Sequence, residues 1–99
     1  MIVVQDIFRL KFGKAKDALE ILKKMKPLIE RTGVRGMRVL TDLTGTSYTL
    51  VLEIQMENLR SFEETLGIAF ADKEWQELYK QFVPLVESGE RQIFTLREI

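Results

Sequence analysis

The sequence predicts an α+β fold, and three observations indicate it. Four segments alternate polar and apolar residues as strands do, and two longer segments repeat their apolar residues every three or four positions as helices do. A short connection containing a glycine joins the two middle strands, which makes them an antiparallel hairpin. The resulting order, β-α-β-β-α-β, is typical of the ferredoxin-like fold, in which a four-stranded antiparallel sheet carries both helices on one face.

The first strand and the first helix occupy the N-terminal third of the chain. Residues 2–12 alternate, and residues 14–32 form an amphipathic stripe of Ala, Leu, Met and Ile with Lys, Asp and Glu opposite. Pro27 removes an amide donor and crowds the preceding turn, so we expect a kink or a break there. Gly33 is expected to close the helix in a left-handed conformation.

The two middle strands are expected at residues 34–43 and 48–56, with the turn at 44–47. Gly45 in that turn suits the positive φ angle that tight hairpins need. Because the strands follow one another directly, they should pair antiparallel.

The second helix is expected in two pieces. Asn58 and Ser61 are both candidate N-caps, and Ser61 has a glutamate at the capping-box spacing. Asp72 then caps a second piece that begins DKEWQELYKQF, and its apolar face is expected to continue through Leu85 and Val86 after Pro84 loosens the helix. Ser88 and the glycine after it are expected to turn the chain into a last strand, residues 91–97.

Alternation assigns the strand residues to two faces of the sheet. Expected toward the helices are Phe8, Leu10, Met37, Val39, Leu50, Leu52, Ile54, Phe94 and Leu96. The other face would carry an apolar patch of Ile7, Leu40, Val51 and Ile93, which a monomer of this size should hide. We therefore expect a homodimer, since two-fold symmetry is the commonest way to cover such a face. The expected dimer interface consists of Ile7, Arg38, Leu40, Val51, Gln55, Ile93 and Thr95.

Composition bounds the class of protein. The chain has 99 residues, and we expect one ferredoxin-like domain over residues 1–99. Fifteen basic and fifteen acidic residues cancel, so no net charge favours nucleic acid or an anionic membrane. The sequence shows no signal peptide and no apolar run long enough for a membrane span, and cysteine is absent. We expect a cytoplasmic protein without nucleic-acid or membrane partners.

The sequence offers little catalytic chemistry. The chain has no histidine, so the usual acid-base residue and the preferred ligand of zinc, non-heme iron and heme are missing. We expect no metal and no cofactor. The glycines do not have the spacing of phosphate-binding loops. RNA-binding modules share this strand order, but their aromatic signature is missing.

Two groups of residues are candidates for ligand contact. Trp75 and Tyr79 lie on one face of the last helix, where core or interface packing is the more frequent explanation and a ligand contact the less frequent one. Glu53 is expected on the second sheet face near Arg9, Arg38 and Arg97. These charges would either line a cavity for an anionic substrate or satisfy one another as ion pairs, and the second interpretation is favoured. Tyr48 completes the candidate set.

The whole chain resembles the dimeric α/β barrel superfamily, in which two ferredoxin-like sheets face each other around a lumen. DKEWQELYKQFVPLVESGERQIF is similar to the late helix, proline turn and final strand of NIPSNAP-like members, and FGKAKDALEILKKM resembles their first helix. The superfamily also includes antibiotic-biosynthesis monooxygenases and heme-degrading enzymes. The heme-degrading members are expected to use a histidine ligand, which this chain cannot supply.

The resemblance implies a fold and a dimer better than an activity. One expected function is that of a small homodimeric protein of undefined role that binds an apolar or weakly anionic metabolite, in the lumen or in a cleft between sheet and helices. The alternative is a cofactor-independent monooxygenase acting on a phenolic or quinol-type substrate. Its substrate contacts would be drawn from Asn58, Trp75, Tyr48, Tyr79, Arg9 and Arg97, although Asn58 is better explained as a helix cap.

Overall fold

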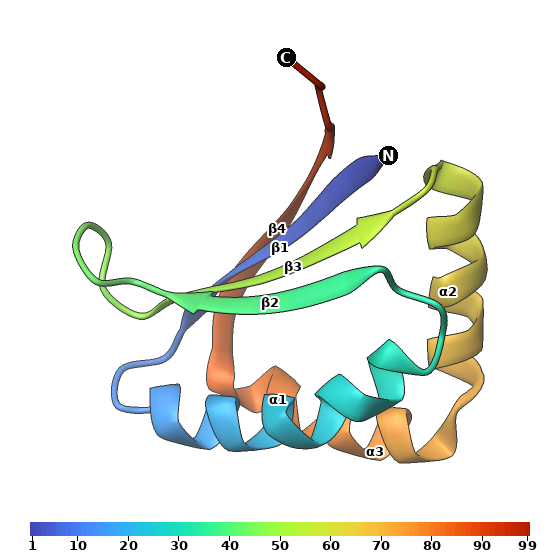
Figure 1. Cartoon of the computed structure of the whole chain (residues 1–99). Helices are drawn as coiled ribbons and strands as arrows, with labels where there is room; N and C mark the ends of the chain where they lie inside the picture. The colour runs from blue at the N-terminus through green and yellow to red at the C-terminus, as the bar shows by residue number, and fades with distance from the viewer.

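The computed structural model describes residues 1–99 and confirms the predicted order of elements (Figure 1). The elements are β1 (Ile2–Leu10), α1 (Ala15–Glu30), β2 (Gly36–Thr41), β3 (Thr49–Met56), α2 (Leu59–Ala71), α3 (Lys73–Phe82), the short 3-10 helix η1 (Val83–Leu85) and β4 (Val86–Thr95). The four strands form one sheet in the order β2-β3-β1-β4, with every neighbouring pair antiparallel. This is the ferredoxin-like topology.

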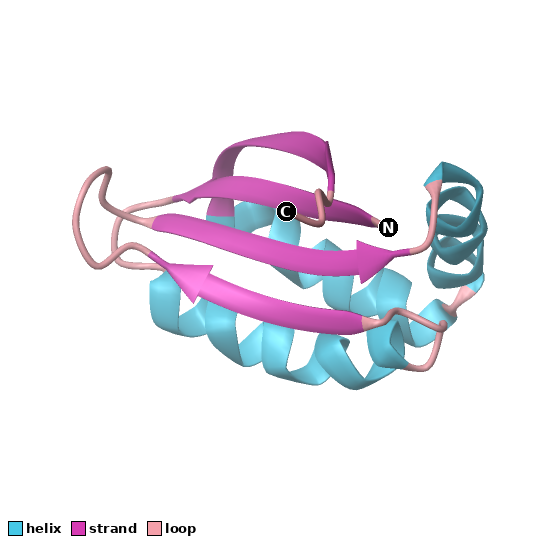
Figure 2. Ribbon diagram, turned by 45° about the horizontal axis from the view of Figure 1, so that its top comes forward, coloured by secondary structure: helices cyan, strands magenta, loops and turns pink.

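The helices leave one face of the sheet free. α1 and α3 run beneath the strands, and α2 stands beside one end of the sheet (Figure 1). The opposite face of the sheet carries no element of the chain (Figure 2). The sheet is therefore packed on one face only.

The core has two parts, both between the sheet and the helices. The larger cluster joins strand residues such as Leu50 to α1 and α3, where Leu22 and Phe82 are buried. The smaller one joins Val4 and Met56 to Phe62 of α2. Each such buried side chain contributes on the order of 1.5–3 kcal/mol to folding. The two clusters therefore pack α3 and α2 against different parts of the same sheet face.

Helix caps divide the second helical region where the sequence predicted. The Asn58 side chain accepts a hydrogen bond from the Ser61 amide at 2.9 Å, so Asn58 rather than Ser61 is the N-cap of α2. The Asp72 carboxylate accepts bonds from the amides of Glu74 and Trp75, which ends α2 and begins α3. The chain direction changes at Asp72, which sets α2 and α3 at an angle.

The hairpin and the first helix differ slightly from expectation. Gly45 has a φ of 94°, as the turn requires. The connection is longer than expected and runs over residues 42–48, and Tyr48 at its end also adopts a positive φ, of 61°. Pro27 does not break α1, which continues to Glu30. Proline lacks the amide donor but keeps its carbonyl, and the Pro27 carbonyl accepts a hydrogen bond from the Arg31 amide at 3.2 Å, so the last turn is retained.

The last strand is where the sequence prediction was wrong. Residues 88 and 89 do not turn the chain but belong to β4, in which Gly89 pairs with Phe8 of β1. The register places Ile93 opposite Val4, and Thr95 opposite Ile2, on the helix side. Phe94 pairs with Val3 on the other face, and Leu96 lies beyond the strand.

The physical reason for this error is that both parities of the last strand carry apolar residues, so alternation alone cannot assign its faces. The uncovered face therefore carries Val3, Ile7, Leu40, Val51 and Phe94, and the predicted Ile93 and Thr95 do not belong to it.

Gly89 allows the Phe8 ring to lie over β4. A Cβ atom at this position would come within 2.9 Å of Phe8 Cδ1, and the ring is itself packed edge-on against Phe82. We expect Gly89→Ala to lower the free energy of unfolding by about 1–3 kcal/mol through overpacking. Urea unfolding of the purified protein would measure it.

Gly36→Ala is the matched control, since a Cβ at that strand glycine meets no atom within 4 Å. Its stability should be unchanged or raised by up to about 1 kcal/mol. Equal effects of the two substitutions would contradict the close approach at Phe8.

Candidate functional site

A cavity of about 510 Å³ lies between the sheet and the helices. Of its 22 lining residues 16 are hydrophobic, and they come from all four strands, from α1, α2 and α3, and from η1. Phe70, Tyr79 and Arg91 line the cavity and remain exposed, so it is open to solvent at these residues. An apolar cavity of this size, with a few polar groups in its wall, is the usual form of a small-molecule site.

Aromatic side chains form one wall. Trp75 and Tyr79, one turn apart on α3, stack with ring centroids 4.9 Å apart and planes at 12°. Phe70 at the end of α2 contacts Trp75 at 5.2 Å between centroids. This arrangement depends on the helix boundary at Asp72, since that cap brings the end of α2 and the start of α3 together.

Trp75 carries an unsatisfied polar group. Its indole Nε1 is buried and has no hydrogen-bond partner within the chain. A buried donor without a partner costs about 1–3 kcal/mol, and most buried donors in proteins avoid that cost. A hydrogen-bond acceptor brought by a bound molecule would remove it.

An ion pair forms the polar part of the wall. Asp6 and Arg91 face each other in the β1–β4 pairing, and Arg91 Nε donates to Asp6 Oδ1 at 2.6 Å. The guanidinium also lies over the Phe62 ring, 5.0 Å from its centroid. Both residues have the strand parity of the helix side, whereas Ser88 and Glu90 border the cavity from positions that face the other way.

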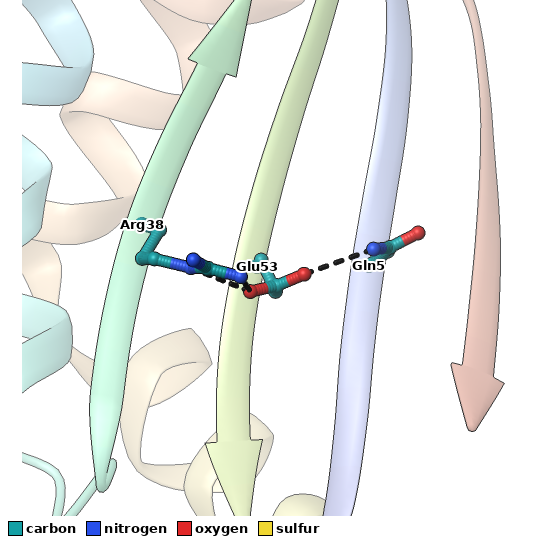
Figure 3. A network of polar contacts seen from close by, with 3 residues as sticks. All are labelled: Gln5, Arg38 and Glu53. Carbon is teal, nitrogen blue, oxygen red and sulfur yellow. Dashed lines mark hydrogen bonds and ion pairs between the residues drawn. The ribbon is translucent and has the colours of Figure 1, made fainter. Parts of the chain in front are cut away.

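The uncovered sheet face carries a separate polar network (Figure 3). Gln5 Nε2 donates to Glu53 Oε1 at 2.9 Å, and Arg38 Nε donates to Glu53 Oε2 at 2.7 Å, with a second bond from Arg38 Nη2. Glu53 is only 7% exposed despite its place on this face. The bonds from Gln5 and Arg38 hold the pKa of the Glu53 carboxyl below its usual value, although burial acts in the opposite direction.

The structure separates the predicted site residues. Trp75 and Tyr79 line the cavity. Tyr48 does not, and packs instead against Phe12 at 5.3 Å between ring centroids. Arg9 is exposed on the uncovered face, and Arg97 is exposed beyond the end of β4.

The charged cluster expected around Glu53 reduces to one arginine. Glu53 pairs with Arg38 and makes no hydrogen bond or ion pair with Arg9 or Arg97. This agrees with ion pairing as the favoured interpretation. Asn58 caps α2, as the alternative explanation for it proposed.

Sequence reasoning did not select Asp6 and Arg91. A signal for Asp6 exists, because a carboxylate between Val4 and Phe8 occupies a strand position that faces the helices. Arg91 can be recognised as its partner only when the β1–β4 register is known.

No group of three or more carboxylate, histidine or cysteine side chains could hold a metal ion. None of the helices has both the length and the apolar character needed to cross a bilayer.

Comparison with known proteins identifies relatives of the chain. The NIPSNAP family model matches residues 6–99. An uncharacterized NIPSNAP domain protein from Burkholderia xenovorans superposes with a TM-score of 0.86 at 22% identity, covering 98% of this chain and 95% of that chain. A NIPSNAP family protein from Agrobacterium tumefaciens gives the same score and identity, covering 98% and 93%.

A more distant similarity is to a mutant of SnoaB, a cofactor-independent oxygenase from Streptomyces nogalater. Its TM-score is 0.76 at 14% identity, covering 99% of this chain and 94% of that chain. At such identity the similarity shows the shared fold. No curated protein matches the chain.

The Glu53 network predicts a pH dependence of stability. Because the folded state lowers the Glu53 pKa, its contribution is complete above the ordinary glutamate pKa of 4.5 and is lost as the pH falls through the lower folded value. We expect Glu53→Gln to lower the unfolding free energy at neutral pH, because the variant loses the charge that Arg38 pairs with. The expected loss is only roughly 1 kcal/mol, because solvent screens the exposed Arg38. The difference from the unmodified chain should shrink at about pH 3.

Glu57→Gln is the control, since Glu57 pairs with Arg35 in an exposed ion pair. It should change stability by less than about 0.5 kcal/mol at either pH. Unfolding by urea at the two pH values measures both variants, and a Glu53→Gln deficit that grows in acid would contradict the assignment.

Proposed function

The chain belongs to the NIPSNAP family, and we propose that it binds a small, largely apolar molecule in the cavity between sheet and helices. The cavity with its aromatic wall and the unpartnered Trp75 N–H carries this proposal. Of the two locations that the sequence left open, the dimer lumen and this cleft, the cleft lies within a single chain.

The composition of the cavity favours binding. Its volume of about 510 Å³ lies within the roughly 300–1,000 Å³ of small-molecule sites. A planar ring could stack on Trp75 and Tyr79, and an acceptor atom of the ligand could accept a hydrogen bond from the indole N–H of Trp75. Because the cavity is open to solvent, an apolar ligand would remove its largely hydrophobic wall from water.

The same proposal includes a homodimer through the uncovered sheet face. Leu40 and Phe94 are 41% and 47% exposed there. Leu40 lies in one row with Val51 and Ile7 across neighbouring strands, and Phe94 lies beside Val3 further along the sheet. The Gln5–Glu53–Arg38 network supports contact with a second copy, because it already satisfies the buried Glu53 carboxylate in the middle of the face. A second copy of the same sheet would cover the apolar residues around it.

A cofactor-independent oxygenase is the second candidate function, and the fold shared with SnoaB favours it. Within the cavity, Trp75 and Tyr79 would contact a phenolic substrate. The other side chains considered for this role, Arg9, Tyr48, Asn58 and Arg97, do not line the cavity, so the structure supports binding better than this chemistry.

Ligand binding can be measured with N-phenylnaphthylamine, a neutral apolar fluorophore. Because Trp75 is the single tryptophan and lines the cavity, binding should quench its emission and enhance that of the probe, with saturation at one probe per chain. Ala69→Phe should weaken binding at least about tenfold, since Ala69 is a buried lining residue and the added ring fills the space.

Ala71→Phe is the control on the same helix, because Ala71 is exposed and outside the lining. Circular dichroism would establish that both variants are folded, and Tyr79→Ala, at a half-exposed position, gives a second way to alter the wall. Equal binding by Ala69→Phe, Tyr79→Ala and the unmodified chain would exclude this cavity.

Light scattering tests the dimer, with an expected mass of about twice 11.6 kDa. Val51→Asp would bury a charge at the centre of the proposed interface and should give monomeric or unfolded protein. Leu43→Asp makes the same kind of change at a fully exposed loop position and should leave the mass unchanged. A monomeric unmodified chain would contradict the dimer directly.

A further inference from the structure

We propose that the Asp6–Arg91 pair selects a neutral ligand group that both donates and accepts hydrogen bonds, such as a carboxamide. The inference deepens the proposed function and rests on it. It assigns the polar end of the ligand, whereas the aromatic wall accommodates its apolar body.

The pair has hydrogen-bonding capacity left over. Its single bond joins Arg91 Nε to Asp6 Oδ1, and neither Asp6 Oδ2 nor the two Nη atoms of Arg91 has a partner within the chain. A carboxylate offers further acceptor sites and a guanidinium five N–H donors. One side of the pair can therefore accept a hydrogen bond from a ligand while the other donates to it.

Both side chains are held in place before any ligand arrives. They occupy facing positions on adjacent strands, and the guanidinium is fixed further by the Phe62 ring beneath it. Their side chains are 25% and 43% exposed, which leaves them accessible from the cavity opening. Groups that are already ordered lose less entropy when a ligand binds.

The charges facing the cavity favour a neutral ligand. Asp6 and Arg91 cancel, and Glu90, the other charged lining residue, belongs to the opposite parity of β4. An anionic ligand that approached Arg91 would be repelled by the Asp6 carboxylate. A cationic ligand that approached Asp6 would be repelled by the Arg91 guanidinium. A carboxamide places its N–H against Asp6 and its carbonyl oxygen against Arg91, so it uses both groups without leaving a charge unpaired.

This geometry also favours one of the two ligand classes that the sequence left open, since it favours an apolar ligand over a weakly anionic one. An anion would be favoured only if Arg91 were free. In this structure Arg91 is already paired with Asp6, so the electrostatic attraction between Arg91 and an anionic ligand is reduced.

A matched series of naphthalene compounds tests the inference on the full chain. Naphthamide, naphthoate, naphthylmethylammonium and methylnaphthalene share one apolar body and differ in the polar group. Titration calorimetry should find naphthamide the tightest, by about tenfold over each of the others, as expected for hydrogen bonds to charged groups. Naphthoate binding as tightly as naphthamide, or more tightly, would overturn the inference.

Two variants reverse the preference if the pair is the recognition site. Asp6→Asn keeps the shape but removes the negative charge, so naphthoate should gain about tenfold while naphthamide loses its charge-assisted bond to Asp6, and naphthoate becomes the tightest ligand. Arg91→Gln should weaken naphthamide and favour naphthylmethylammonium. Arg35→Gln, in the exposed pair with Glu57, is the control and should leave the order unchanged.

The outcomes distinguish this inference from the proposed function. If no compound of the series binds, including methylnaphthalene, the binding function itself fails. If the compounds bind but both variants retain the naphthamide preference, the cavity binds ligands and the Asp6–Arg91 pair does not select them. Circular dichroism of each variant keeps loss of folding apart from loss of recognition.

Discussion

The pairing of β1 with β4 is the constraint on which the rest of this structure depends. β1 lies in the middle of the sheet and pairs along nearly its whole length with both β3 and β4. Its register against β4 brings Arg91 to Asp6 and Gly89 to Phe8. Because side chains alternate between the two faces of a strand, a shift of one residue would move the arginine to the uncovered face and a different set of side chains into the cavity.

The division of the second helical region produces the other half of the cavity. A single straight helix over the same residues would present one stripe to the sheet and could pack along it. The cap at Asp72 instead turns the chain between α2 and α3, and each packs against a different part of the core. The space left between the two helices and the β1–β4 side of the sheet is where Phe70, Trp75 and Tyr79 meet.

The two faces of the sheet handle charge differently. On the uncovered face, both carboxylate oxygens of Glu53 accept hydrogen bonds from Gln5 and Arg38 on the neighbouring strands, so this buried charge is satisfied within the chain. On the helix face, Asp6 and Arg91 satisfy each other through one bond and keep further donors and acceptors available. This contrast is a physical reason to place small-molecule recognition on the helix side and protein contact on the other. The NIPSNAP family and the shared fold with an oxygenase are compatible with that division, since one fold can serve several functions.

The sequence by itself determined the elements and their order, because local periodicity, caps and turn residues act over a few positions. The cap at Asp72, the positive φ at Gly45 and the aromatic stripe with Trp75 and Tyr79 could all be predicted in this way. It also determined that imidazole and thiolate chemistry are unavailable, since the chain has neither histidine nor cysteine. Only the tertiary structure decided which face Ile93 and Phe94 occupy, and that Asp6 meets Arg91. Those facts depend on the register between β1 and β4, in which Asp6 and Arg91 lie 85 positions apart in sequence. The last strand carries no local signal for that register, since both of its faces are partly apolar.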